Sequence, residues 1–210
     1  MGVTSPVPSS LRARRKAETW SALHEAAASL AVEHGVDGTT VEAVAEAAGV
    51  SARTFFNYFR SKEDAILGMR EPSLDPALLE GFRPERDLLD QVSHLLLAVA
   101  RSAYAGGDAE RRRELVRQHP GLGQRRRELT VEAEEIVRRT LADRLARHPQ
   151  WSAGIGEHDV DEVARMLVMV AGVPLRFAVT SPGYAAAAGL VPDDLAAALA
   201  LLHDVQRKLP

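Results

Sequence analysis

The sequence predicts an all-helical protein, with a small N-terminal helix-turn-helix domain and a larger C-terminal helical domain. Alanine, leucine, glutamate and arginine dominate the chain, and all four favour helices. Runs of β-branched residues are short. Between glycine and proline breaks, almost every segment repeats its apolar residues with the helical period of about 3.6 residues. These observations favour about nine helices and no sheet.

A long helix is expected first. Apolar residues from Trp20 to Ala31 form one stripe within residues 12–34, and a single apolar stripe is typical of a helix packed against a core. Gly35 can end this helix because glycine tolerates positive φ. A basic cluster that includes Arg12 lies at the beginning of the helix.

Two short helices joined by a tight turn follow. Thr40, or the threonine before it, can cap a helix that Gly49 ends. Only one residue separates Gly49 from Ser51, which can cap a third helix that runs through about residue 59. This arrangement predicts a helix-turn-helix at about 40–59.

The remaining helices belong to a larger region. Ser61 can cap a fourth helix in a capping-box pattern, and Pro72 and Pro76 then interrupt the helical periodicity. We therefore expect an N-terminal domain at 1–66 and a C-terminal domain at 67–210. Further helices are expected at about 85–105, 108–118, 121–148, 158–180 and 192–208.

The third expected helix holds half of the Phe and Tyr residues of the chain, four of eight. On a helical wheel, Ala52, Phe55 and Phe59 share one side, Arg53, Thr54, Asn57 and Arg60 share the opposite side, and Phe56 and Tyr58 lie between them. The first side is expected to anchor the helix in a core. The opposite side is expected to face a partner, and an ordinary solvated face is the alternative.

The polar side has the chemistry that reads DNA. The major groove admits a helix, where arginine can bind guanine, asparagine can bind adenine and a threonine methyl group can contact thymine. Basic side chains and helix N-termini can bind phosphates. The residues expected to contact DNA are Arg14, Arg15, Lys16, Thr40, Ser51, Ala52, Arg53, Thr54, Phe56, Asn57, Tyr58 and Lys62.

The segment from Thr39 to Leu67, TTVEAVAEAAGVSARTFFNYFRSKEDAIL, resembles the DNA-binding segment of TetR-family bacterial transcriptional regulators. The resemblance covers the helix-turn-helix and the beginning of the fourth helix, whereas the rest of the chain agrees in its helix pattern alone. It implies that Thr40, Tyr58 and Lys62 contact phosphates.

Three positions depart from the family pattern. The family most often has Tyr where this chain has Phe56, often His at Asn57, and often Gly at Arg53. Because Phe56 has no hydroxyl for a phosphate, we expect it to contribute packing or a contact with a thymine methyl group. Arg53 adds a long donor, which is expected to favour guanine.

The resemblance also implies a homodimer, built from the last two long helices, that binds a palindromic operator on double-stranded DNA. The segment 160–179 is apolar on most of its circumference, more than packing within one subunit needs. The residues expected at the dimer interface are Val163, Leu167, Val170, Leu195, Leu199 and Leu202.

By the same resemblance, the middle helices should hold a pocket for an unknown small-molecule effector. The expected protein is a repressor that a small hydrophobic or amphipathic ligand releases from DNA. The residues that could line the pocket are His94, Tyr104, His119, Trp151, Met166, Met169 and Phe177, and each is also a common core or surface residue.

Composition argues against several other classes of protein. Without cysteine the chain has no disulfide and no Cys-ligated metal site. No apolar run approaches the roughly 20 residues that cross a bilayer, so we expect a cytoplasmic protein with no membrane contact. Zinc-protease and dinucleotide-binding spacings are missing. We therefore expect no enzymatic activity, no catalytic residues, no metal site and no cofactor.

Two other functions remain open. A helical protein–protein adaptor could use the aromatic helix to bind another protein. Its affinity should depend little on salt, whereas a protein that contacts DNA phosphates loses affinity steeply as salt rises. The same fold could also serve a ligand-independent regulator or an activator.

Overall fold

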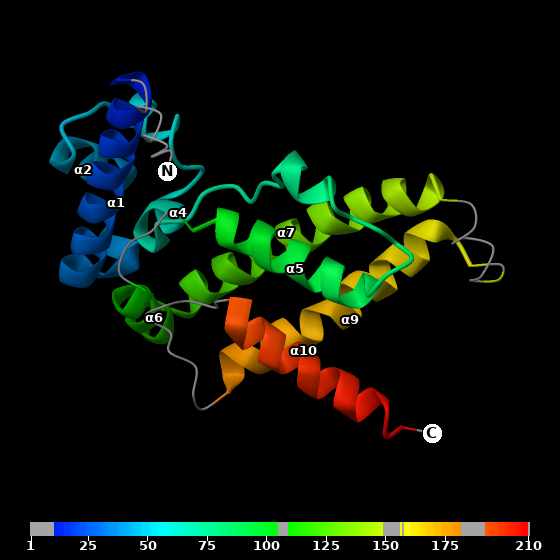
Figure 1. Cartoon of the computed structure of the whole chain (residues 1–210). Coiled ribbons are helices and arrows are strands. Elements are labelled where there is room, and N and C mark those ends of the chain that lie inside the picture. The colour runs from blue at the N-terminus through cyan, green and yellow to red at the C-terminus, as the bar shows by residue number, and fades with distance from the viewer. Residues whose placement is uncertain (1–10, 105–108, 149–155, 157, 182–191, 210) are drawn as a thin grey trace, which may run out of the picture. The chain divides into compact units, whose positions relative to one another are not determined.

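The computed structural model describes residues 11–104, 109–148, 156, 158–181 and 192–209. Every regular element among these residues is a helix, which confirms the predicted fold class (Figure 1). The chain divides into two compact units, Met1–Arg70 and Glu71–Pro210, which we call unit 1 and unit 2.

Unit 1 is built on a long first helix that the next helices cover. Helix α1 contacts α2 and α4, and α2 in turn contacts α3. Near the C-terminal end of α1, Gly35 interrupts the helical geometry with a φ of 74°, as its position in the sequence predicted. The helices of unit 1 are α1 (Leu11–Gly38), α2 (Val41–Ala47), α3 (Ala52–Phe55) and α4 (Lys62–Leu67).

Each of the three short helices begins at a hydroxyl residue that caps it. The side chains of Thr40, Ser51 and Ser61 each accept a hydrogen bond, at 3.1 Å, from the amide three residues later. Such a cap satisfies a backbone donor that the helix leaves free, and each contributes about 1 kcal/mol. The predicted starts of these helices are therefore correct.

Helix α3 is shorter than the sequence suggested. It was expected to run through about residue 59, but it ends at Phe55, and residues 56–58 form tight turns. The amides of Asn57 and Tyr58 bond to carbonyls three residues back, at 3.0 and 2.9 Å, instead of four. Phe55 and Phe59 are nevertheless both buried, as the helical wheel predicted, with ring centroids 5.7 Å apart.

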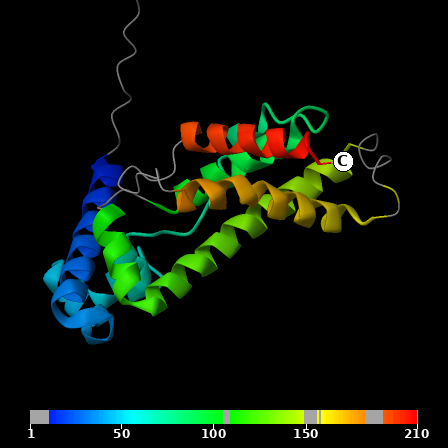
Figure 2. The same ribbon diagram turned by 90° about the horizontal axis from the view of Figure 1, so that it is seen from below.

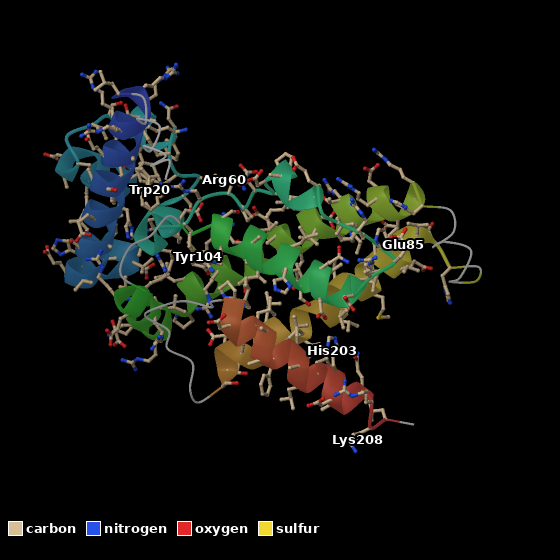
Figure 3. All side chains as sticks on the ribbon, in the orientation of Figure 1. Trp20, Arg60, Glu85, Tyr104, His203 and Lys208 are labelled. Atoms are coloured by element: carbon tan, nitrogen blue, oxygen red, sulfur yellow. The ribbon has the colours of Figure 1, made fainter. Side chains whose placement is uncertain are left out.

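Aromatic rings fill the centre of unit 1. The ring of Trp20 on α1 (Figure 3) lies 5.3 Å from that of Phe59 and 5.4 Å from that of His24. The guanidinium of Arg70 lies over the same indole, 5.0 Å from its centroid. His24 Nδ1 is 2.7 Å from the carbonyl oxygen of Ala65, so the ring cluster fastens α1 to α4.

Unit 2 has its own core, formed by three mutually packed helices. Helices α5, α7 and α9 contact one another, α10 lies against α9 and α5, and α6 lies against α7 (Figures 1 and 2). The bounds lie close to the expected ranges. The elements are a short 3₁₀ helix η1 (Pro76–Leu79), α5 (Leu88–Ser102), α6 (Ala109–Gln118), α7 (Pro120–Ala146), α9 (Val160–Thr180) and α10 (Pro192–Gln206).

Helix α9 is more apolar than was expected from the sequence. By length and composition alone it could cross a membrane, whereas no run of that kind was expected. A core helix of a water-soluble protein passes the same test, and α9 packs against α5, α7 and α10. Its buried residues include Ala164, Val168 and Ala171, which join the core of unit 2.

An ion-pair network joins α7 to α9. Arg138 donates two hydrogen bonds to the carboxylate of Glu135, at 2.6 and 2.7 Å, and a third bond to Asp161 at the beginning of α9. Arg139 adds a bond to Glu135 at 2.5 Å. These donors, Arg138 first, lower the pKa of Glu135 from its ordinary 4.5 to about 2.

Substitution of Gly68 tests how tightly α4 closes on α1. Gly68 has a φ of 61°, and a Cβ atom there would lie 2.7 Å from the ring of His24; Gly49 has a φ of 68° but open space around it. We expect Gly49→Ala to lower the free energy of unfolding by about 1 kcal/mol and Gly68→Ala by about 3 kcal/mol, because strain and overpacking add. Urea unfolding of both variants measures this, and equal losses would contradict the close contact.

The Glu135 network predicts acid sensitivity of unit 2. A carboxylate with a lowered pKa in the folded state stabilises the protein above the unfolded pKa, and that stability is lost as protonation becomes possible. Stability should therefore fall between about pH 4.5 and pH 2. The effect should be modest because more than a third of the Glu135 side chain is exposed.

Thermal unfolding across this pH range provides the measurement. We expect Glu135→Gln to flatten the acid loss, since Gln cannot be protonated there. Glu162→Gln on the exposed side of α9 is the control, because the structure gives Glu162 no ion pair with a described residue. If both variants followed the wild-type profile, the network would not stabilise the fold.

Candidate nucleic-acid interface

A hollow in unit 1 separates the first turns of α1 from the segment of residues 52–59, which we call the α3 segment. Its volume is about 700 Å³. Three cationic side chains and no carboxylate line it, although unit 1 carries as many acidic as basic residues. The positive charge is thus concentrated here, which suits an anion. The lining residues are Leu11, Arg12, Arg15, Lys16, Thr19, Thr54, Asn57 and Tyr58.

The hollow gathers five of the residues predicted to contact DNA, from two elements far apart in sequence: Arg15, Lys16, Thr54, Asn57 and Tyr58. Arg14, Thr40, Ser51, Ala52, Arg53, Phe56 and Lys62 lie outside its lining. Leu11 and Thr19 belong to it and were not predicted. Helical spacing could have revealed Thr19, since it lies on the same face of α1 as Arg12 and Arg15.

The two hydroxyls at the beginning of α3 are used within the helix itself. Ser51 Oγ accepts a bond from the Thr54 amide and lies 2.9 Å from Thr54 Oγ1. These contacts fix the first turn of α3. They leave Arg53 and Asn57, both exposed, as the long polar side chains that the α3 segment presents to a partner.

Phe56 projects from the α3 segment. Its side chain is 60% exposed, and its ring stands nearly perpendicular to that of the fully buried Phe55, 5.4 Å away at 84°. Edge-to-face contact of this kind orients an exposed ring without burying it. An apolar ring held outward beside Arg53 and Asn57 is available to a methyl group of a partner.

Lys62 is turned toward the protein. Its Nζ atom donates hydrogen bonds to the carbonyl oxygens of Val36 at 2.7 Å and Thr39 at 2.9 Å. The Val36 carbonyl lies in the last residues of α1, after the break at Gly35, and the Thr39 carbonyl lies between α1 and α2, immediately before Thr40. The ammonium group of Lys62, which was predicted to contact a phosphate, therefore already donates to two backbone carbonyls.

The structure corrects the expected dimer interface. Leu195 and Leu199 are buried, at 0% and 3% exposure, in a cluster with Leu97 of α5. Helix α10 packs on α5 and α9 of its own chain, so these leucines are used within the subunit. The other expected interface residues, Val163, Leu167, Val170 and Leu202, are half-buried.

Three of the residues expected to line an effector pocket share one exposed side of a helix. Met166, Met169 and Phe177 lie on the exposed side of α9, with Met166 61% exposed. His94 is exposed, and its Nδ1 lies 2.8 Å from the Asp90 carbonyl. Tyr104 is exposed with Arg112 over its ring, and His119 immediately precedes α7. Trp151 lies outside the described residues. Within the described part of the chain, no three His, Asp or Glu side chains are placed to hold a metal ion.

Comparison with known proteins shows that the segment with this geometry is similar to a known family. Residues 23–67 match the family model described as bacterial regulatory proteins, tetR family, and no curated protein matches the chain. A crystal structure from Streptomyces avermitilis, provisionally classed as a TetR transcriptional regulator, is 22% identical over 87% of this chain and 97% of its own. Its TM-score of 0.32 is too low to support any inference about the fold. The family match covers most of α1 and the segment that holds α2, α3 and α4, which is the segment that carries the hollow's Thr54, Asn57 and Tyr58.

Proposed function

We propose that this DNA-binding regulator acts as a homodimeric repressor on a palindromic operator. The observation that carries the proposal is the cationic hollow beside the α3 segment, in a part of the chain that matches the tetR family. A helix with exposed polar side chains can enter the major groove, and cations to one side of it can hold the adjacent phosphates. The hollow and the exposed Arg53 and Asn57 supply these two kinds of group.

The contacts divide by chemistry. Arg53 and Asn57 are proposed to read bases, guanine and adenine respectively, and Phe56 to meet a thymine methyl group. Arg15 and Lys16 are proposed to bind the phosphates beside the groove. Tyr58 lines the same hollow, and its hydroxyl can donate a hydrogen bond to a phosphate oxygen.

A second copy of the chain is proposed to cover the exposed side of α9. Met166, Met169, Val173 and Phe177 recur there at helical spacing, and each is more than 40% exposed. An apolar stripe of this size on a water-soluble protein marks an interaction surface. Two copies related by a two-fold axis can match the two halves of a palindrome, because each brings one α3 segment.

Release by a small hydrophobic or amphipathic effector stays a prediction of the family resemblance. Of the residues considered for its pocket, Met166, Met169 and Phe177 are exposed on α9. Repression by occupancy of the operator, a cytoplasmic location and the absence of enzymatic activity belong to the same proposal. A thermal-shift screen of small apolar compounds addresses the effector, with binding expected to raise the unfolding temperature.

The burial of the aromatic rings favours DNA over a protein partner. Phe55 and Phe59 are buried, so Phe56 alone of the three phenylalanines in the α3 segment is exposed. A helix that binds a protein groove usually offers several apolar anchors along one face. The α3 segment instead offers arginine, asparagine and one ring.

Loss of Arg53 or Asn57 should weaken and broaden recognition of the operator. We expect Arg53→Ala and Asn57→Ala each to cost about 1–3 kcal/mol of operator affinity and to relax the preference at one base pair. An operator selected from random duplex DNA with the wild-type protein, followed by titration of single-base variants, measures this. Arg147→Ala is the matched control, since Arg147 is an exposed arginine in unit 2.

The same titrations decide between DNA binding and an adaptor. A DNA-binding protein should lose affinity for the selected operator linearly on a log–log plot against salt. If no duplex were enriched, or if the alanine variants bound as well as the wild type, the proposed surface would be wrong.

A charge on the exposed side of α9 should dissociate the dimer. We expect Met169→Glu to raise the dimer dissociation constant at least about tenfold, because the carboxylate would be buried without a partner. Sedimentation equilibrium measures this. Val131→Glu is the control, because Val131 is equally apolar and 62% exposed but lies on α7. Equal association of the two variants and the wild type would exclude this side of α9 as the interface.

A further inference from the structure

Lys62 connects two parts of unit 1 that are distant in sequence. It is the first residue of α4, and its ammonium group reaches the turn between α1 and α2. The acceptors are backbone carbonyls of Val36 and Thr39, at 2.7 and 2.9 Å. Two of the three ammonium donors are thereby used.

The carbonyls that Lys62 holds lie just after the break in α1. Gly35 breaks α1, and carbonyls near the end of a helix lack intrahelical partners. They also carry partial negative charge, which favours a nearby cation. Lys62 therefore supplies a donor to the Thr39 carbonyl and a second donor to the Val36 carbonyl, which also accepts from the Thr39 amide at 3.3 Å.

Both ends of this connection are fixed. On the α4 side, Ser61 caps the helix, and Ala65 is buried, with its carbonyl 2.7 Å from His24 Nδ1. On the turn side, the buried Thr39 donates its hydroxyl proton to the Gly35 carbonyl at 2.8 Å. Lys62 thus joins two ordered groups of atoms.

The next residue along the chain from Thr39 is Thr40, the N-cap of α2. Helix α2 packs against α3, so the position of the Thr39 carbonyl sets where α2 begins and where α3 is supported. A change at Lys62 would move Thr40 and the start of α2 relative to α4.

We propose that Lys62 is a positioning residue for DNA recognition, which acts through Thr40 and α2 and does not supply a phosphate contact of its own. This rests on the proposed DNA-binding function. Its consequence is specific: removal of the ammonium group should disturb discrimination between operator and other DNA, and should leave the number of phosphates neutralised by the protein unchanged.

The variant Lys62→Met tests the proposal because Met keeps most of the aliphatic stem and removes the charge. Lys16→Met is the matched control, since the same chemical change is made at an exposed lysine of the hollow. Both are made in the full chain with Trp151→Phe, so that the remaining tryptophan, Trp20, reports unfolding of unit 1. The measurements are the unfolding temperature, the affinity for the selected operator and for an unrelated duplex, and the dependence of both affinities on salt.

We expect opposite patterns from the two variants. Lys62→Met should lower the unfolding temperature by roughly 5 °C or more and should reduce the ratio of operator to unrelated-duplex affinity about tenfold. Its salt slope should equal that of the wild type. Lys16→Met should keep the unfolding temperature and the ratio, and should lose about 0.9 of slope per protomer, the value for one phosphate.

Two outcomes would overturn the proposal. A slope reduced by about 0.9 per protomer in Lys62→Met, at an unchanged unfolding temperature, would make Lys62 a phosphate contact. A lower unfolding temperature with an unchanged affinity ratio would make it a residue of stability alone.

A second variant covers the case in which Lys62→Met does not fold. Lys62→Gln retains an uncharged NH₂ group that can donate to the carbonyls, so it should recover part of the stability and of the discrimination. If it lost slope as a phosphate contact would, the proposal would be wrong. A double variant with Thr40→Ala should show a non-additive loss of discrimination, since both changes act at the start of α2.

The proposed function can fail separately. If the wild type bound no duplex, DNA recognition by this chain would be refuted. The proposed role of Lys62 in DNA recognition would then be refuted as well. The comparison of Lys62→Met with Lys16→Met by unfolding temperature would then still decide whether Lys62 holds the turn between α1 and α2.

Discussion

The packing of Phe59 against Trp20 of α1, and of Phe55 against Phe59, is the constraint on which the rest of unit 1 depends. Helix α3 has one turn, and a helix of that length is not stable alone. The two rings hold it in place, with Phe59 stacked near Trp20. Both rings are buried, whereas Phe56 and Asn57 between them are exposed. The packing of the two buried rings therefore determines which side chains of the α3 segment are exposed.

Charge placement follows from the same arrangement. Unit 1 is balanced in acidic and basic residues, so long-range attraction of the whole unit to DNA is weak. The cations that matter are those that α1 brings beside the α3 segment, where no carboxylate opposes them. Since the aromatic cluster joins α1 to α4 and Phe59, core packing sets the distance between the cationic side chains and Asn57.

Local patterns predicted most of the helices, and long-range packing decided which faces they bury. Caps at Thr40, Ser51 and Ser61 and the break at Gly35 depend on neighbours within a few residues, so the sequence was sufficient. A periodic stripe, in contrast, says that a face is apolar and does not say what covers it. Leu195 was expected between subunits and lies inside one, whereas Met166 was expected inside and is exposed. Lys62 likewise needed the fold, because its acceptors lie far away in sequence.

There is a physical reason why the exposed apolar residues lie on α9 while the leucines of α10 are buried within the subunit. Small residues such as Ala164, Ala171 and Gly172 lie on the buried side of α9, where they let α5 and α7 approach closely. The large flexible residues are then left for the opposite side. A methionine-rich surface can adapt to a partner at little steric cost, which suits contact with a second copy whose two halves must meet along one axis. The small residues on the buried side of α9 thus pack within the subunit, and the large residues on its exposed side are available to a second copy.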